Sequence, residues 1–344
     1  MYRFNSDYTE GCHPAILAKL AETNMEQTDG YGLDPHCDHA RALIKEYFSC
    51  PEADVHFLVG GTQTNLTVIC ASLRPHQAVY GAVPSHINTH EAGAIEHVGH
   101  RVLPLPSPDG KLTAAQIAAE WKKYATDPSR EHWAQPKMVY ISQPTEIGSM
   151  YTKEELEALY AVCKEAGLYL FVDGARLGYV LGAPANNMTP ADLAANCDVF
   201  YVGGTKCGLL FGEAVVITNP ALKEDFRTIA KQNGAIMAKG RLLGVQYEAA
   251  FTDNLYTSIC RKGTLQALRI KEALLARGFK FITDSPTNQQ FVILTPEQYT
   301  KLSEEFALSL IEYLPDGNYN VRICTSWASE EAQVDKLIAM INEL

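Results

Sequence analysis

The sequence predicts a three-layer α/β fold with a mostly parallel sheet, joined to a smaller C-terminal α/β domain. Short apolar runs alternate with stretches of helical spacing along much of the chain, which is the pattern of a sheet covered by helices on both faces. The alternation changes after Asn219 and Pro220, where a long helical region begins. The chain has 344 residues, of which 47% are hydrophobic and 20% charged, and this suits a sizeable core and two domains.

Seven apolar runs are the predicted strands of the sheet. Each is rich in aliphatic, β-branched or aromatic residues and ends at turn residues. They lie near residues 55–58, 78–80, 101–105, 138–141, 168–172, 199–202 and 214–217. Helical spacing appears between them at residues 66–73, 114–124 and 153–166. Thr152 and Glu155 form a capping box that marks the start of the last of these helices.

The C-terminal part of the chain has a different pattern. A helical region reaches about Ala250, and helices with short strands at residues 291–294 and 321–324 follow it. We therefore predict a large domain with an N-terminal arm over residues 1–250 and a small domain over residues 251–344. No low-complexity linker or fixed-period repeat separates them, so the two domains are expected to pack directly on one another.

The net charge of the chain excludes two classes of partner. A formal charge of −11 and the lack of any Lys or Arg run give no attraction to nucleic acid or to an anionic membrane.

The amino terminus lacks the apolar stretch of a signal peptide. No segment approaches the roughly 18 apolar residues of a transmembrane helix. We expect a cytoplasmic protein.

The cysteines and histidines do not form a recognisable metal or disulfide pattern. Nine cysteines, an odd number, are scattered from Cys12 to Cys324 without a C-x-x-C pair, so we expect reduced, mostly buried thiols. The pair His36 and His39 and the pair His86 and His90 each lack a complete ligand set. No metal site is predicted.

Polar side chains follow two neighbouring predicted strands. Asp173 and Arg176 come directly after strand 168–172, and Lys206 follows strand 199–202 through a Gly-Gly-Thr turn. Groups at the carboxyl ends of strands in an open α/β sheet converge on one crevice. An amine, a carboxylate and an arginine together suit pyridoxal phosphate, which needs an amine for a Schiff base and a carboxylate to keep its ring nitrogen protonated. The alternative is that Asp173 caps a helix and Lys206 is a solvated loop lysine.

Two further segments could serve the same ligand. Gly60, Gly61 and Thr62 end strand 55–58 and open a helix, where free N–H groups and the helix dipole attract a phosphate. The motif is neither a Walker loop nor a G-x-G-x-x-G fingerprint, and a purely structural turn is the alternative. His86 follows another strand and opens a helix. Its ring could stack on a flat heteroaromatic ring or make a single cap hydrogen bond.

Taken in order, these motifs resemble the threonine aldolases, pyridoxal phosphate enzymes of the aspartate-aminotransferase-like group (fold type I). The resemblance covers nearly the whole chain. It implies a seven-stranded sheet in the large domain, a smaller C-terminal domain, and a homodimer or homotetramer with active sites at subunit interfaces. The motifs are residues 5–7 (Asn-Ser-Asp), 29–35 (Asp-Gly-Tyr-Gly-Leu-Asp-Pro), 60–65 (Gly-Gly-Thr-Gln-Thr-Asn), 85–87 (Ser-His-Ile), 91–94 (Glu-Ala-Gly-Ala), 172–176 (Val-Asp-Gly-Ala-Arg) and 203–206 (Gly-Gly-Thr-Lys).

The resemblance also implies a role for each site residue. Lys206 forms the Schiff base, Asp173 pairs with the ring nitrogen, and His86 stacks on the ring. The remaining cofactor contacts come from Gly60, Gly61, Thr62, Thr205 and Arg176, and the substrate contacts from Ser6, Arg176, Arg322 and, from the neighbouring subunit, Tyr31. Arginine suits the carboxylate position because it pairs in a bidentate manner.

The implied reaction splits L-threonine or L-allo-threonine into glycine and acetaldehyde by breaking the Cα–Cβ bond. One departure leaves the base for the substrate hydroxyl open. Many family members carry an Asn-Thr-His-Asn run where this chain has Gln143-Pro144-Thr145-Glu146-Ile147-Gly148. His86, Glu146 or a bound water could serve, and a carboxylate in this role needs a pKa raised by burial. The preference between threonine, allo-threonine and aromatic β-hydroxy amino acids is open, as is any requirement for a monovalent cation.

Two other functions remain compatible with these residues. Another pyridoxal phosphate enzyme, a β-eliminating lyase or a racemase, would use the same Lys206, Asp173 and Arg176. A non-catalytic binding protein on the same fold is the alternative from another class. Only an aldolase yields glycine together with an aldehyde.

Overall fold

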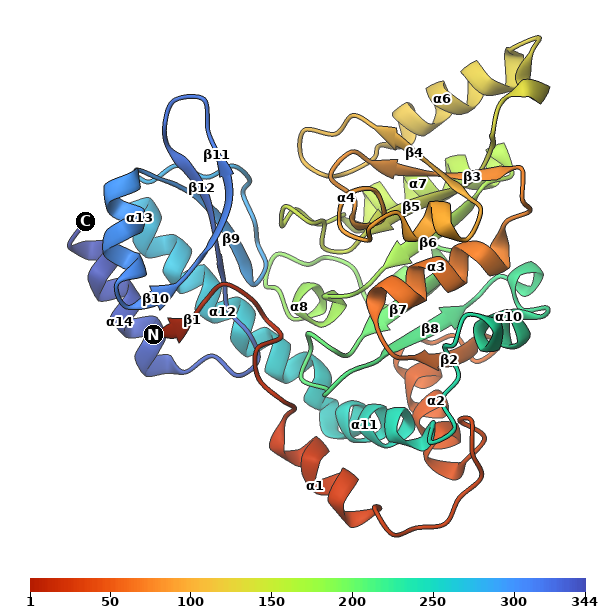
Figure 1. Ribbon diagram of the computed structural model, residues 1–344, viewed down its shortest axis with the longest axis horizontal. Coiled ribbons are helices and arrows are strands. Elements are labelled where there is room, and N and C mark those ends of the chain that lie inside the picture. Colours follow the sequence, from red (N-terminus) through yellow and green to blue (C-terminus); the bar gives the residue numbers. More distant parts are fainter.

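A seven-stranded sheet forms the centre of the protein, for which a computed structural model describes residues 1–344 (Figure 1). Its strand order is β2-β8-β7-β6-β5-β3-β4, and β7, β6, β5, β3 and β4 run parallel. Only β8 runs antiparallel to its neighbours. The strands are β2 (Asp54–Leu58), β3 (Gln77–Ala82), β4 (Arg101–Leu105), β5 (Gln135–Ser142), β6 (Tyr169–Asp173), β7 (Val199–Gly203) and β8 (Glu213–Ile217). The predicted mostly parallel sheet is confirmed.

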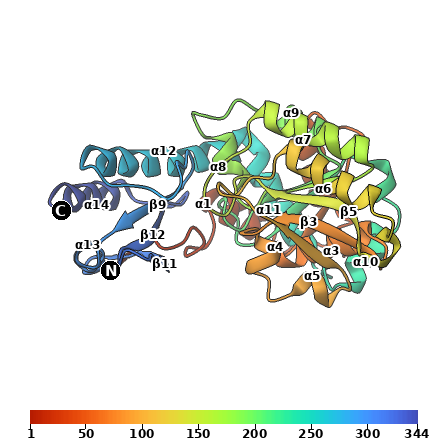
Figure 2. The same cartoon turned by 90° about the horizontal axis from the view of Figure 1, so that it is seen from above.

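Helices cover both faces of this sheet (Figure 2). On one face α3, α4, α5 and α10 bury a core with Val68, Ile95 and Phe226. On the other face α2, α6, α7, α9 and α11 bury a second core with Ile44 and Leu156. The helices of this part are α1 (Pro14–Glu22), α2 (Pro35–Tyr47), α3 (Gly61–Ser72), α4 (His86–Thr89), α5 (Ala94–His97), α6 (Ala114–Thr126), α7 (Lys153–Ala166), α8 (Leu177–Leu181), α9 (Pro190–Ala195), α10 (Phe226–Gln232) and α11 (Arg241–Phe251), with 3₁₀ turns at Arg130–His132, Pro220–Leu222 and Thr252–Asn254.

The C-terminal part has its own antiparallel sheet and core. Its strand order is β11-β12-β9, and α12, α13 and α14 pack against it. The elements are α12 (Leu255–Ala276), β9 (Gln289–Leu294), α13 (Pro296–Ser303), β10 (Phe306–Ala307), β11 (Ser309–Tyr313), β12 (Tyr319–Cys324) and α14 (Glu331–Asn342). Both termini lie at this end of the molecule (Figure 1).

The first residues of the chain belong to this C-terminal core. Strand β1 (Tyr2–Arg3) pairs in parallel with β10, and Phe4 is fully buried among C-terminal side chains such as Phe306 and Val321. The chain then crosses to the large sheet, so residues 5–8 lie between the two parts. The proposed boundary near residue 250 stays a prediction, and it coincides with the turn between α11 and α12.

Local sequence signals account for most element boundaries. The seven predicted strand runs all fall within or beside strands of the sheet, and α7 spans the predicted 153–166. Its capping box is present: the Thr152 side chain accepts from the Glu155 backbone N–H, and the Glu155 side chain accepts from the Thr152 backbone N–H. The helical region predicted up to about Ala250 contains two helices, because α10 ends at Gln232 and Gly234, with φ +70°, turns the chain before α11.

Candidate active site

One pocket lies at the carboxyl edge of the parallel strands and brings together five of the residues selected from the sequence. These five come from four separate loops and helix starts. The lining is Gly61, His86, Ser142, Pro144, Glu146, Asp173, Ala175, Arg176, Tyr201 and Lys206. In the sheet register Ser142 at the end of β5 stands opposite Asp173 at the end of β6. The convergence expected at the sheet edge is therefore observed.

Asp173 is 5% exposed and is surrounded by donors. The Ala175 N–H donates to Oδ1 at 2.9 Å, and the Asn65 amide donates to Oδ2 at 3.2 Å. The Tyr140 hydroxyl also donates to Oδ2. Burial disfavours the charged carboxylate, but the positive charge of His86 and the tyrosine hydroxyl outweigh it and hold the Asp173 pKa below its usual range. Asp173 is kept ionised at neutral pH.

His86 is tied to this carboxylate through a buried polar chain. Its Nδ1 lies 2.7 Å from Oε1 of Glu91, and the Asn65 amide donates to the same oxygen at 2.6 Å. Asn65 thus bridges Glu91 and Asp173. Burial favours the neutral ring, but the Glu91 hydrogen bond and the nearby negative charges raise the His86 pKa. The protonated imidazole is therefore favoured.

Lys206 sits on a turn that a buried carboxylate holds. Glu213, at the start of β8, accepts a 2.9 Å hydrogen bond from the Thr205 hydroxyl and a 3.2 Å bond from the Gly204 N–H. The Thr205 hydroxyl also accepts from the Gly212 N–H at 3.1 Å. Thr205 thus anchors the turn and does not line the pocket. Burial raises the pKa of Glu213 from 4.5 to about 8.

The start of α3 faces the same pocket and fits an anionic group. Gly60 is the N-cap, and no side chain caps this helix end, so the first N–H groups have no partner within the helix. A Cβ built on Gly60 would meet nothing within 4 Å, and one on Gly61 would lie 3.5 Å from the Tyr201 hydroxyl. The space and donors suit a phosphate. Thr62 lies on the exposed side of this turn.

Arg176 is held by a buried ion pair. Its Nε and its terminal nitrogen donate to the two oxygens of Asp7 at 2.7 and 2.9 Å, and the Asn288 amide donates to Oδ2 at 2.9 Å. Burial opposes ionisation of Asp7, but Arg176 outweighs it and lowers the Asp7 pKa. The segment between the two domains is thereby fixed to the end of β6.

Ser6 precedes Asp7 in the chain, and Arg322 lies on β12 of the C-terminal sheet. Neither residue lines the pocket. One terminal nitrogen of Arg322 donates to the Asn5 carbonyl at 2.9 Å, and the other donates to Gln289 Oε1 at 3.1 Å. Its Nε and the Ser6 hydroxyl are buried without a partner. Unpaired buried donors of this kind are expected where a ligand completes the hydrogen bonding.

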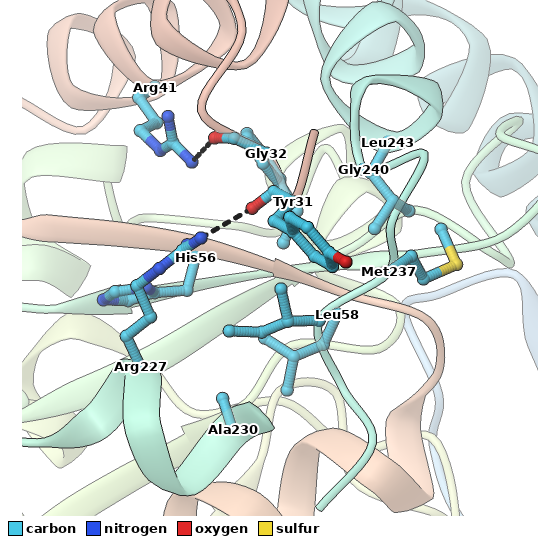
Figure 3. Close-up of a pocket in the computed structure, with 12 residues that line it drawn as sticks. Tyr31, Gly32, Arg41, His56, Leu58, Arg227, Ala230, Met237, Gly240 and Leu243 are labelled. Carbon is cyan, nitrogen blue, oxygen red and sulfur yellow. Dashed lines mark hydrogen bonds between the residues drawn. The ribbon is translucent and has the colours of Figure 1, made fainter. Parts of the chain in front are cut away.

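Tyr31 does not lie in the Lys206 pocket of its own chain. It borders a separate surface pocket with Arg41, His56 and Arg227 (Figure 3). Its side chain is 47% exposed, its φ is +60°, and Arg227 donates to its carbonyl at 2.8 Å. Within one chain, Tyr31 is thus an exposed residue whose backbone carbonyl is fixed by Arg227.

Glu146 forms the wall of the pocket beyond β5. Its Oε1 accepts from the Ser142 hydroxyl at 2.6 Å and from the His86 N–H at 2.9 Å. Burial raises the Glu146 pKa, and the negative charge of Asp173 adds to this effect. A raised pKa makes this carboxylate a stronger base than one in water.

The sequence reasoning gave no role to several side chains that build the site. Tyr140, Tyr201, Asn65, Glu91 and Glu213 are buried and contact or flank its charged groups. The signal for the two tyrosines was available. Each stands an even number of residues before a strand's last residue, Ser142 and Gly203, so each points to the same face as that end residue.

The other sequence expectations concern metals, thiols and membranes. All nine cysteines are free, and six of them are buried. His36 contacts Glu26 and Glu248, each at 2.7 Å, and no group of three His, Cys, Asp or Glu side chains is arranged to hold a metal ion. None of the helices combines the length and apolar character needed to cross a bilayer.

Comparison with known proteins agrees with this geometry. The Beta-eliminating lyase family model matches residues 3–295. A low specificity L-threonine aldolase from a Pseudomonas species is 30% identical, over 98% of this chain and 96% of the relative. A solved Leishmania major threonine aldolase is 46% identical with a TM-score of 0.97, covering 100% of this chain and 99% of that one.

A more distant structure shares the fold alone. A serine palmitoyltransferase solved with pyridoxal phosphate is 15% identical, with a TM-score of 0.72, and matches 100% of this chain and 86% of that one. On the family match and the two aldolase relatives, the chain belongs to the beta-eliminating lyase family and, within it, to the threonine aldolases.

Proposed function

We propose that this protein is a pyridoxal phosphate-dependent aldolase that cleaves L-threonine or L-allo-threonine to glycine and acetaldehyde. The observation that carries the proposal is the convergence of Lys206, Asp173, His86 and Arg176 on one pocket beside the open start of α3. The membership of the threonine aldolases supports the choice of reaction. When bound, the cofactor supplies an electron sink for the pair released from the broken Cα–Cβ bond.

The residues of the pocket fit that cofactor in position and charge. Lys206 supplies the amine that attaches it, and the ionised Asp173 would pair with its ring nitrogen. The N–H groups at Gly61 and Thr62, with the neighbouring Gly60, would hold its phosphate. His86 would lie on the ring face, oriented by Glu91. Thr205 contributes by fixing the turn that carries Lys206.

A second group of residues fits the substrate carboxylate. Arg176 lines the pocket, and Ser6 and Arg322 lie next to the ion pair of Arg176 with Asp7. The unpartnered Arg322 Nε and Ser6 hydroxyl are free to donate to a carboxylate. Fixing the carboxylate there orients the Cα–Cβ bond relative to the ring, which decides which bond at Cα breaks.

The first test is the absorption spectrum of the purified protein before and after L-threonine, with aldehyde and glycine measured in the same sample. A cofactor band that shifts while both products appear is expected. A band that shifts without aldehyde would move the chemistry to elimination, racemisation or another β-hydroxy substrate. Absence of any band after adding pyridoxal phosphate would overturn the proposal.

Lys206→Ala is the decisive variant. It is expected to lose covalent attachment of the cofactor and measurable turnover. Lys122→Ala, which removes an exposed lysine of α6 outside the pocket, is the matched control. Retained aldehyde release by the Lys206 variant would contradict the assignment.

The proposal includes an oligomer in which Tyr31 reaches the substrate site of a neighbouring subunit. Its exposed ring, and its position outside its own chain's pocket, support this role. Mixing inactive Lys206→Ala subunits with impaired Tyr31→Ala subunits tests it, since a mixed dimer regains one intact site. No recovery of activity after confirmed subunit exchange would contradict a shared site. A cytoplasmic location and the choice between dimer and tetramer stay predictions.

A further inference from the structure

We propose that Glu146 carries a proton from the β-hydroxyl of the substrate to Cα of the glycine product. This inference rests on the proposed aldol cleavage and assigns the one role that the sequence left open between His86, Glu146 and a water. Three features of the pocket carry it.

The first feature is the anchored position of Glu146 in the pocket. Its Oε1 accepts from the Ser142 hydroxyl at 2.6 Å and from the His86 backbone N–H at 2.9 Å. The side chain lines the same pocket as Lys206. The carboxylate is therefore held at the space that a substrate would enter, where a general base must lie.

The second feature makes His86 a weaker candidate for the role. Its Nδ1 is engaged by Glu91 at 2.7 Å, and Glu91 and Asp173 raise its pKa. Both effects favour the protonated ring, which can only donate. The Glu146 carboxylate, by contrast, is an acceptor whenever it is ionised.

The third feature is the surrounding charge. Burial and the neighbouring Asp173 raise the Glu146 pKa, while the Ser142 hydrogen bond opposes the shift. The carboxylate thereby becomes a better base than one in water.

The proposed step balances in atoms and charge. The Glu146 carboxylate takes the hydroxyl proton, the O–H electron pair becomes the second bond of the aldehyde carbonyl, and the Cα–Cβ pair remains with the glycine fragment. The cofactor, when bound, would supply the electron sink for that pair. After the aldehyde leaves, the Glu146 acid returns the proton to Cα. Glu146 begins and ends ionised, and threonine becomes glycine and acetaldehyde without an added reactant.

A structural role is the rival explanation, because Glu146 also binds the His86 N–H at the start of α4. Glu146→Gln separates the two roles. The Gln amide oxygen can still accept from the Ser142 hydroxyl and the His86 backbone N–H. If Glu146 only caps α4, turnover by the variant is therefore expected to stay near that of the wild type. A proton carrier predicts that the variant binds cofactor and gives the same spectral shift on adding substrate, while kcat falls by about 10²–10³-fold. Glu157→Gln, an equal charge change on the exposed face of α7, is the control.

The pH profile gives the second readout. In the wild type, kcat/KM is expected to fall as pH drops through the Glu146 pKa, and this acid limb is expected to vanish in Glu146→Gln. Ser142→Ala removes the hydrogen bond that lowers this pKa, so its acid limb is expected at higher pH. This variant keeps Glu146 and serves if the Gln variant folds poorly.

A third readout uses the protein without cofactor. An acid whose folded pKa is raised binds its proton more tightly when folded, so wild-type stability falls as pH rises above the ordinary value of 4.5. Glu146→Gln lacks this loss, and its Tm relative to wild type is expected to rise as pH rises above 4.5. Glu157→Gln is expected to show no such trend.

The outcomes separate this inference from the function beneath it. Substrate binding without turnover, a lost acid limb and the expected Tm trend support Glu146 as the proton carrier. Turnover within a few-fold of wild type with the acid limb retained overturns it and leaves Glu146 as a cap. A wild type that releases no aldehyde overturns the proposed function, and this role with it.

Discussion

The ends of β6 and β5 lie side by side, yet their carboxylates are in opposite electrostatic situations. Asp173, at the end of β6, accepts from Ala175, Asn65 and Tyr140 and has a lowered pKa. Glu146, beyond the end of β5, accepts from the Ser142 hydroxyl and the His86 backbone N–H and has a raised pKa. Pairs of acids whose surroundings push their pKa values apart mark a division of labour between fixed charge and proton transfer.

The difference arises from what each strand end places around its carboxylate. Asp173 is the last residue of its strand, so donors from β5, from α3 and from its own turn reach it. Glu146 lies in a loop beside the negative charge of Asp173. The ionisation of one acid therefore favours the protonation of the other, and changing Asp173 is expected to change Glu146.

Asp173→Asn should have the largest effect, because it removes the negative charge expected to face the ring nitrogen. We expect kcat to fall by about 10³-fold, as for loss of a preorganised charge in an active site. The Glu146 acid limb should also move to lower pH, since the repelling charge is gone. Turnover across pH with cofactor absorbance measures both.

Asp198→Asn is the control for this change. Asp198 is also fully buried, but it accepts from the Leu170 N–H and Lys164 at the amino end of the same strands. Its loss is expected to lower stability and leave turnover per folded molecule unchanged. Equal activity losses in the two variants would mean that Asp173 acts through folding alone.

Tyr140→Phe should have a smaller effect in the same direction. It removes one donor to Asp173 and keeps the ring packed on Phe171, with which it makes an edge contact at 5.4 Å. A hydrogen bond to a charged group contributes about 1.5–3 kcal/mol, so kcat should fall by about tenfold or somewhat more. If Tyr140→Phe changes neither kcat nor the pH profile, the hydrogen bonds from Asn65 and Ala175 suffice to hold Asp173 ionised.

The elements of the site were predictable where a strand end fixed a position along the chain. Lys206, His86 and Gly61 each follow a strand of the large sheet, Asp173 is the last residue of another, and all four line the pocket. The period of the strands and the topology of an open sheet are local or general rules. They place backbone ends without knowledge of side-chain packing.

Contacts between distant elements were not predictable in this way. The bridge from Glu91 through Asn65 to Asp173 joins three segments, and its existence depends on rotamers and on the approach of α3 to the sheet. Strand β1 is two residues long and pairs with β10 about 300 residues later, so no periodicity marks it. Tyr31 needs a second chain before its proposed role can be seen in coordinates.

Glu213→Gln should have the smallest effect on turnover and the sharpest effect on pH dependence. Glu213 is a third carboxylate at this edge, 3% exposed, and burial raises its pKa to about 8. Its work is to hold Thr205 and Gly204, and Gln keeps one acceptor for that turn. We therefore expect kcat within about tenfold of wild type, in keeping with loss of one or two hydrogen bonds.

The pH dependence of stability in the cofactor-free protein tests the direction of the Glu213 pKa shift. A raised folded pKa means that the folded state holds the proton more tightly, so wild-type stability falls as pH rises from the ordinary value of 4.5 to about 8. Glu213→Gln has no proton to lose, and its Tm relative to wild type should rise across that window and level off above it. A Tm difference between variant and wild type that does not change with pH would mean that Glu213 ionises at an ordinary pKa. Glu213 would then be a fixed charge like Asp173. Only Glu146 would contrast with Asp173 at this sheet edge.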